Sequence, residues 1–146
     1  MARELRLSPQ PWPWVGPRVL VEDADSERAD ALVPVLRRAG YAVAVCSGPL
    51  PAERCPLAGE DGCAAAEGAD VVVSSLGLRS AEAREALSAL RTRLPRTPLV
   101  VQADLEEVAR WPELVAGCEI VAAPATPEQL LEGVRAALER EVSGVA

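Results

Sequence analysis

The sequence contains no lysine, histidine, phenylalanine or asparagine, and it has one residue each of isoleucine, methionine and tyrosine. All 15 basic residues are therefore arginine. The rare residue types tend to have A/T-rich codons, so the bias indicates a GC-rich, bacterial genome. Without histidine or lysine, and without a nucleophile elbow or a paired acid and base, the chain has no recognisable catalytic set. We expect that it is not an enzyme.

Other absences exclude some classes of binding partner. No apolar run approaches the ~20 residues of a membrane span. No signal core is present at the N-terminus, because Pro9, Pro11, Pro13 and Pro17 interrupt it. The net charge of −7 argues against binding to nucleic acid, which relies on clustered basic residues. We expect a cytoplasmic protein without a nucleic-acid or membrane partner, and its cysteines are expected to be thiols rather than structural disulfides.

A chain of 146 residues suits one domain and can bury a core without disulfide bonds. We divide it into a Pro/Trp-rich arm, residues 1–17, and a domain, residues 18–146. The arm carries Trp12 and Trp14 among prolines that favour extended backbone. Packing of these tryptophans on their own domain is the favoured interpretation, and an anchor for a partner is the alternative.

Within the domain, five short apolar runs alternate with segments of helical periodicity. The expected strands are Arg18–Glu22, Tyr41–Cys46, Val71–Ser75, Leu99–Ala103 and Ile120–Ala122. The expected helices are residues 26–39, 62–67 and 80–93, a short one after Asp104 that Trp111–Pro112 breaks, and one after Thr126. Continuous β-branched runs are typical of strands covered on both faces. The pattern predicts an α/β fold with a doubly wound, five-stranded parallel sheet in the flavodoxin-like order 2-1-3-4-5.

Residues at the helix ends support this division. Thr126, Pro127 and Gln129 form the pattern of an N-terminal capping box, and Ser80 and Asp104 are expected caps. Gly40 is the expected C-terminal cap of the first helix. Pro34 lies inside that helix, where it predicts a kink or a late helix start.

Ligands of an open α/β sheet bind at the carboxyl ends of its strands. The first strand ends on Glu22 and Asp23, and the third ends on Ser74 and Ser75. The fifth is followed by Ala123–Pro124. Most positions where chemistry is expected therefore carry residues that cannot supply it.

The order and spacing of five segments resemble the receiver domain of response regulators over residues 18–140. The segments are Val19-Leu20-Val21-Glu22-Asp23, Arg37-Arg38-Ala39-Gly40-Tyr41, Gly68-Ala69-Asp70-Val71-Val72-Val73, Thr97-Pro98-Leu99-Val100-Val101, and Pro124 before the last helix. In that family an acidic pair holds Mg²⁺ and an aspartate accepts a phosphoryl group, which a Ser or Thr and a lysine then bind. The lysine precedes a cis proline, so the resemblance implies a cis Ala123–Pro124 bond.

The resemblance assigns these roles to particular positions. Glu22 and Asp23 match the acidic pair, Ser75 stands at the acceptor aspartate, Gln102 at the Ser or Thr, Ala123 at the lysine, and Ile120 at the aromatic residue that usually reports the switch. A serine cannot form the acyl phosphate and removes a metal ligand. We therefore expect a degenerate form, a pseudo-receiver that signals through protein–protein contact without phosphorylation. Glu22 and Asp23 are interpreted as a solvated acidic rim, with a weak metal site as the alternative.

Cysteines are concentrated where a receiver has its second helix. Cys46, Cys55 and Cys63 lie there, and Cys118 is expected at the opposite edge of the sheet. Their spacing matches no common zinc pattern. Three interpretations stay open: thiols that fill apolar niches, a Cys55–Cys63 redox pair, or a thiolate-bound metal. No other cofactor is expected, and a redox- or metal-responsive sensor is the alternative function.

A partner surface is predicted next to the fifth strand. Trp111 and Leu114 lie on the short helical segment interrupted by Pro112. Tryptophan is enriched at interface hot spots, and receivers commonly use the face formed by the fourth helix, fifth strand and fifth helix. The expected partner is a protein, with a homodimer as one form.

Overall fold

The computed structural model describes residue 12 and residues 16–49, 55–59 and 61–145. Its strands are β1 (Arg18–Glu22), β2 (Ala42–Cys46), β3 (Val71–Ser74), β4 (Leu99–Ala103) and β5 (Glu119–Ala122). Its helices are α2 (Ser26–Arg38), α3 (Ala64–Glu67), α4 (Ala81–Arg93), α5 (Leu105–Arg110), α6 (Pro112–Val115) and α7 (Pro127–Val145). The expected strands and helices are present, with small differences at their ends.

All neighbouring strands pair in parallel, and the sheet order is β2-β1-β3-β4-β5. The predicted order 2-1-3-4-5 is confirmed. The register places Glu22 beside Cys46 on one side and beside Ser74 on the other. Because every strand runs the same way, the strand ends at residues 22, 46, 74, 103 and 122 meet at one edge of the sheet.

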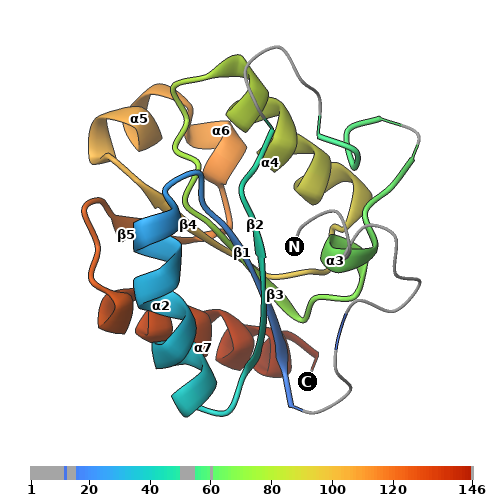
Figure 1. The fold of residues 1–146 in the computed structure, drawn as a ribbon. Helices are drawn as coiled ribbons and strands as arrows, with labels where there is room; N and C mark the ends of the chain where they lie inside the picture. Colours follow the sequence, from blue (N-terminus) through green and yellow to red (C-terminus); the bar gives the residue numbers. More distant parts are fainter. Residues whose placement is uncertain (1–11, 13–15, 50–54, 60, 146) are drawn as a thin grey trace.

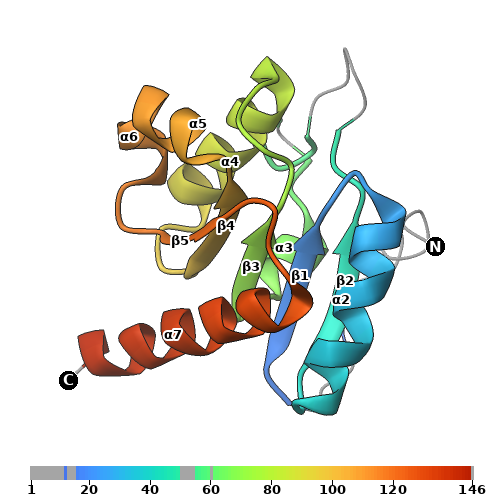
Figure 2. The same ribbon diagram turned by 90° about the vertical axis from the view of Figure 1, so that its left-hand side faces the viewer.

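Helices cover both faces of the sheet (Figures 1 and 2). Helices α2 and α7 pack together on one face, over a core that includes Val19, Val21 and Val100. Helices α3 to α6 lie on the other, over a core that includes Leu20 and Val72. Alternate residues of each strand supply the two cores, as the period of a strand requires. Among the described residues, no helix is long and apolar enough to cross a membrane.

The helix ends mostly follow their sequence signals. Gln129 N–H donates to Thr126 Oγ1 at 3.1 Å, and Thr126 N–H donates to Gln129 Oε1 at 2.8 Å, so the predicted capping box is formed. Ser80 Oγ accepts from Ala83 N–H at 3.0 Å. Gly40, with a φ of 99°, follows the last residues of α2 in the left-handed conformation that favours glycine.

Two local predictions are confirmed only in part. Helix α2 begins at Ser26 and passes through Pro34 to Arg38, so the late start is not seen. Asp25 explains the early start, because its carboxylate accepts from the N–H groups of Glu27 and Arg28. Asp104 occupies the N-cap position of α5, but its side chain makes no capping hydrogen bond there.

Trp12 packs on its own domain, as the favoured interpretation predicted. It is 3% exposed and belongs to the core under α3 and α4. Its indole N–H donates to the Ala65 carbonyl at 2.9 Å. A Cβ at Gly68 would lie 2.7 Å from the Trp12 ring, so the indole sits where only glycine allows it. Trp14 lies outside the described residues, and the boundary between residues 17 and 18 stays a prediction.

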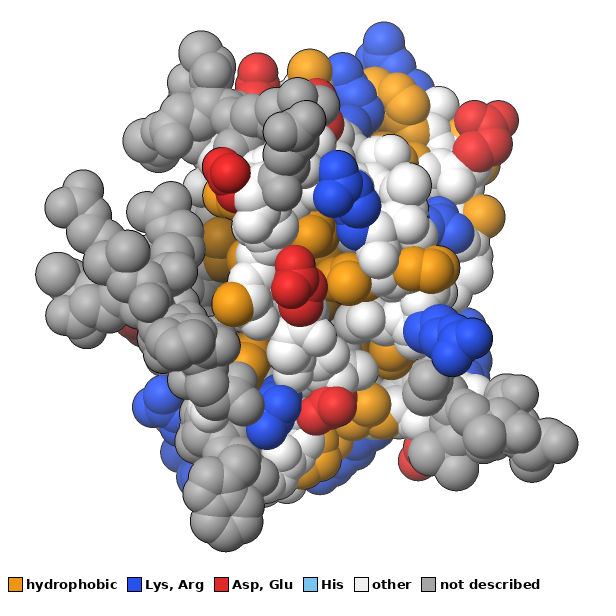
Figure 3. All heavy atoms as spheres, turned by 90° about the vertical axis from the view of Figure 1, so that its right-hand side faces the viewer, with side chains coloured by type: hydrophobic (Ala, Val, Ile, Leu, Met, Phe, Trp, Pro, Cys, Tyr) orange, Lys and Arg blue, Asp and Glu red, His pale blue; other side chains and the backbone are white. Residues whose placement is uncertain are grey.

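The crossover between β2 and β3 differs from the other crossovers. In its described residues the helical part is the single turn α3, and the Trp12 indole fills space beside it. Figure 3 looks onto the side of the molecule that carries α3. Apolar side chains show at this surface between the grey segments, with acidic and arginine side chains interspersed among them. The described part of this face therefore has no patch of one charge sign.

Candidate functional site

The polar residues at the carboxyl edge of the sheet are buried. Glu22, Asp23, Ser74, Ser75 and Gln102 are each no more than 5% exposed. The interpretation of Glu22 and Asp23 as a solvated rim is therefore wrong. Buried polar groups are costly unless they are hydrogen-bonded, so the partners of each group decide what this site can do.

Asp23 is held by the arginine in the first turn of α2. Arg28 Nη2 lies 2.6 Å from Asp23 Oδ1, and Arg28 Nε lies 2.7 Å from Oδ2, which makes a two-pronged ion pair. The Asp25 N–H adds a third bond, to Oδ1 at 2.9 Å. Arg28 Nη2 also donates to the Ser75 carbonyl at 3.0 Å. One guanidinium thus links the ends of β1 and β3.

Ser75 and Gln102 form a second connection across the same edge. Gln102 Nε2 donates to Ser75 Oγ at 2.8 Å, and Gln102 Oε1 accepts from Ala125 N–H at 2.9 Å. The Ala123–Pro124 bond that precedes Ala125 is cis, as predicted. The position that the resemblance assigns to a lysine is therefore next to this network, but Ala123 brings no charge to it.

Glu22 is the one described group at this edge with an unsatisfied atom. Its Oε1 is buried and has no hydrogen-bond partner among the described residues. Burial raises the pKa of Glu22 from the ordinary 4.5 to about 7, and the hydrogen bond with Ser74 offsets only part of that rise. A carboxyl group with this pKa is partly protonated near neutral pH.

These residues do not fit the Mg²⁺ site that the fold family implies. Mg²⁺ binds ionised carboxylates in a near-ideal octahedral arrangement and keeps several bound water molecules. Both oxygens of Asp23 already bind Arg28, the pKa of Glu22 is raised, and Ser75 brings no carboxylate. Arg28 supplies the positive charge that Asp23 would otherwise take from a metal.

A small cavity remains beside the network. It measures about 340 Å³, and its lining includes Arg28, Ser75, Gln102 and Ala123. Arg79, at its rim, pairs with Glu107 at 3.2 Å and with Asp104 at 3.8 Å. The arginines that line this cavity therefore both have acidic partners, so the cavity offers little uncompensated positive charge to an anion.

Three of the cysteines lie on the same side of the sheet, packed against one core. Cys46, Cys55 and Cys63 pack against the same core, and charge on Glu22, Cys55 or Cys63 would raise the pKa of Cys46. Burial is the main cause that raises the pKa of Cys46, to about 11, and burial also raises the pKa of Cys55. All four cysteines are free thiols.

This environment does not favour the sensor interpretation. The reactive form of cysteine is the thiolate, and a raised pKa makes it scarce at neutral pH. No group of three or more metal-ligating side chains within the described ranges is arranged to hold a metal. The thiols of Cys46 and Cys55 fit the interpretation of small groups that fill apolar niches.

The predicted interface residues lie at the surface around α6. Trp111 and Leu114 are both half-buried, in α6 and at its start. The guanidiniums of Arg84 and Arg110 lie 4.5 and 5.0 Å from the centre of the Trp111 ring, within cation–π range. Leu105, on the neighbouring helix α5, is 64% exposed. Trp111 keeps exposed area for a partner, and its role there stays a prediction.

Two sets of contacts were missed by reasoning from the sequence: those of Arg28 at this site and the particular partners of Trp12. Arg28 is the side chain that closes the site. Its position could have been predicted in part from the sequence. A helix that follows a strand directly places its first turn over the carboxyl edge, where an arginine can reach an acidic strand end. The partners of Trp12 had no such signal, because the arm has no periodicity.

Searches by structure find proteins with this architecture. A CheY-like receiver domain protein from Methanospirillum hungatei is 20% identical, with 88% of this chain and 98% of that chain covered and a TM-score of 0.66. A receiver domain from Clostridium thermocellum is 17% identical, with coverages of 86% and 96% and a TM-score of 0.65. A signal receiver domain of an HD domain-containing protein from Pseudomonas fluorescens is 20% identical, with coverages of 88% and 98% and a TM-score of 0.62.

These identities place the similarity at the level of the fold. The chain has the five-stranded parallel architecture of response-regulator receiver domains. Neither a family model nor a curated protein sequence matches it.

Proposed function

We propose that this chain is a receiver-like signalling module that works without phosphorylation of an aspartate and acts through contact with a protein partner. The observation that carries the proposal is the internal bonding at the carboxyl edge of the sheet. Asp23 is bound by Arg28 and Ser75 by Gln102, at the positions where the receiver family binds metal and phosphoryl group.

The chemistry of the three altered positions points the same way. The Ser75 hydroxyl is not the carboxylate that receives a phosphoryl group as an acyl phosphate. Ala123 supplies no cation to neutralise such a group, and Gln102 is occupied by its two hydrogen bonds. These bonds connect the polar groups at this edge to one another without a metal or a phosphoryl group.

A partner surface on this module would lie around α5, α6 and β5. Trp111 and Leu114 are half-buried there and Leu105 is exposed, which gives apolar area beside charged residues. Interface cores are enriched in tryptophan and arginine, and Trp111 with Arg84 and Arg110 provides both. A second copy of the chain is one partner that would fit. The sensor alternative, based on Cys46, Cys55 and Cys63, has no observation in its favour.

The proposal is tested with a small phosphodonor. The purified protein is incubated with acetyl phosphate and Mg²⁺ and its intact mass is measured, with an intact receiver domain as the positive control. We expect the control to gain a phosphoryl group and this chain to gain none. A phosphoryl adduct on this chain, whether acid-labile or acid-stable, would overturn the proposal.

A further inference from the structure

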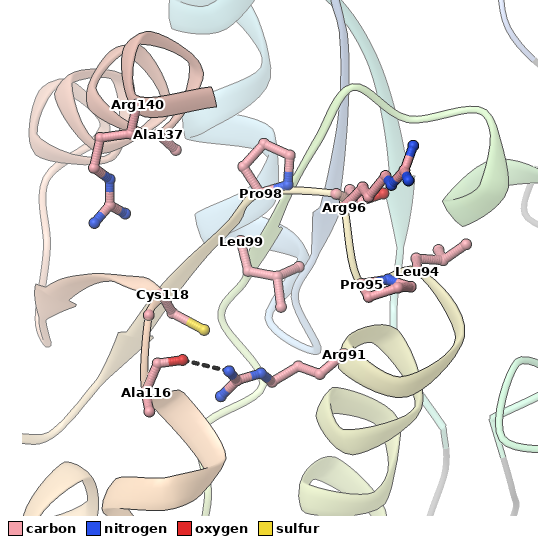
Figure 4. A pocket seen from close by; sticks show the side chains of 12 residues that line it. Arg91, Leu94, Pro95, Arg96, Pro98, Leu99, Ala116, Cys118, Ala137 and Arg140 are labelled. Carbon is pink, nitrogen blue, oxygen red and sulfur yellow. Dashed lines mark hydrogen bonds between the residues drawn. The ribbon is translucent and has the colours of Figure 1, made fainter. Parts of the chain in front are cut away.

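A second hollow lies at the opposite, amino-terminal edge of the sheet (Figure 4). It is an open groove of about 810 Å³, between the end of α4, the segment that leads into β4, the α6–β5 connection and α7. This size falls within the range of about 300–1,000 Å³ typical of ligand sites. The groove is separate from the carboxyl-edge network.

The charged side chains that line this groove are all arginines: Arg91, Arg96 and Arg140. This is notable in a chain whose net charge is −7. Arg140 pairs with Glu119 at 3.1 Å and keeps 56% of its side chain exposed. Arg96 is exposed and has no partner among the described residues. The local charge of the groove is therefore opposite to that of the molecule.

Arg91 is half-buried, and its hydrogen-bond partners are carbonyl oxygens at the end of α6. It donates to the carbonyls of Glu113 at 3.2 Å and Leu114 at 2.6 Å, and also to that of Ala116. Carbonyl groups hold the guanidinium in place, but they do not cancel its positive charge. The charge is thus positioned and remains available to an anion in the groove.

Apolar groups form the floor between the arginines. Leu99 is 6% exposed and Ala137 is 1% exposed, and Pro98 lies beside them. The Cys118 thiol also lines the groove, close enough to feel both Arg91 and Arg140, yet burial still raises its pKa. It therefore acts as a neutral, apolar part of the floor. Figure 4 shows Arg140 and Arg96 on opposite sides of Pro98 and Leu99.

We propose that this groove binds an acidic peptide segment of a partner protein, in which carboxylates flank an apolar side chain. Guanidinium groups bind carboxylates through paired hydrogen bonds, and the floor offers an apolar side chain a place to be buried. The three arginines come from separate elements and surround the floor instead of converging on one point. That arrangement suits several carboxylates along a chain better than one compact anion. The inference does not depend on the absence of phosphorylation.

The test is fluorescence anisotropy with a fluorescein-labelled peptide of alternating glutamate and leucine, titrated with the full chain. We expect saturable binding that weakens as salt is raised. The variants Arg96→Glu and Arg140→Glu should each weaken binding about five- to tenfold, since an exposed ion pair is worth up to ~1 kcal/mol and reversal adds repulsion.

Arg135→Glu is the matched control. Arg135 is also on α7, pairs with Glu132 at 2.8 Å and has a side chain 49% exposed, but it does not line the groove. It should leave peptide affinity within about twofold of the unchanged chain, since exposed pairs of this kind contribute little. The proposal is overturned if the peptide does not bind at millimolar concentration, if Arg135→Glu weakens binding as much as Arg140→Glu, or if a lysine–leucine peptide binds equally well.

Discussion

Arginine has opposite roles at the two edges of the sheet. At the carboxyl edge, Arg28 is bound to the buried carboxylate of Asp23, and Arg79 is paired with Glu107. At the amino edge, Arg140 is paired with Glu119, but within the described part of the chain Arg91 donates only to carbonyls and Arg96 has no partner. Arg28 thus uses its charge to close a site, whereas the charges of Arg91 and Arg96 stay available to a ligand. In a receiver fold the first edge normally carries the chemistry, and here its polar groups are mostly bonded to one another.

The largest effect is expected at Trp12, which belongs to the core under α3 and α4. Trp12→Ala removes an indole that is 3% exposed and its hydrogen bond to Ala65. Truncation of a buried tryptophan costs about 3–5 kcal/mol of unfolding free energy. Urea denaturation should show this loss, and the half-buried Trp111→Ala should show a smaller one. An equal or smaller loss for Trp12→Ala would mean that the Trp12 side chain is not part of the core.

The second-largest effect is expected from Glu22, whose titration should make the stability of the folded chain depend on pH. Its pKa is raised from 4.5 to about 7 in the folded chain, so the folded state binds this proton more tightly than the unfolded state. Its contribution to stability is therefore full below pH 4.5 and is lost as the pH rises through 7. At about 1.4 kcal/mol per unit, the whole loss is about 3 kcal/mol.

Glu22→Gln isolates that contribution, because glutamine mimics the protonated carboxyl group. The variant should match the unchanged chain near pH 4 and be more stable at pH 8 by up to about 3 kcal/mol. Urea denaturation at the two pH values measures the difference. A variant that is less stable by the same amount at both values would show that the Glu22 carboxyl does not titrate in this way.

A smaller effect is expected from the Arg28–Asp23 pair. Removal of one member of a buried pair costs 3–5 kcal/mol, but the Arg28 side chain is 42% exposed, so Arg28→Ala should cost about 2 kcal/mol. Arg38→Ala, at the exposed end of the same helix, is the control and should cost a few tenths. Denaturation of the Asp23→Ala, Arg28→Ala double variant should give less than the sum of the single losses. Additive losses would show that the pair is not coupled.

The fold was predictable because local and global signals agree in this chain. The apolar runs define the strands, and Thr126 with Gln129 defines the start of α7. For the candidate site, the sequence predicted which residues take part but not how they are arranged. The positions of Glu22, Asp23, Ser75 and Gln102 could be inferred from strand ends, but their burial could not, because it depends on how Arg28 folds back from the next helix. The groove at the amino edge left no contiguous pattern, since its arginines come from three separate segments.

The most direct test of the account is whether a divalent metal reaches the carboxyl edge. Mn²⁺ is added at millimolar concentration to the ¹⁵N-labelled chain, and paramagnetic broadening of the backbone amide signals is measured. Because Arg28 occupies both oxygens of Asp23, we predict no selective broadening at residues 22–25 and 74–76, in contrast to an intact receiver domain under the same conditions. Saturable broadening centred on Glu22, Asp23 and Ser75 would contradict the account, because it would show a metal site that the internal bonds leave open.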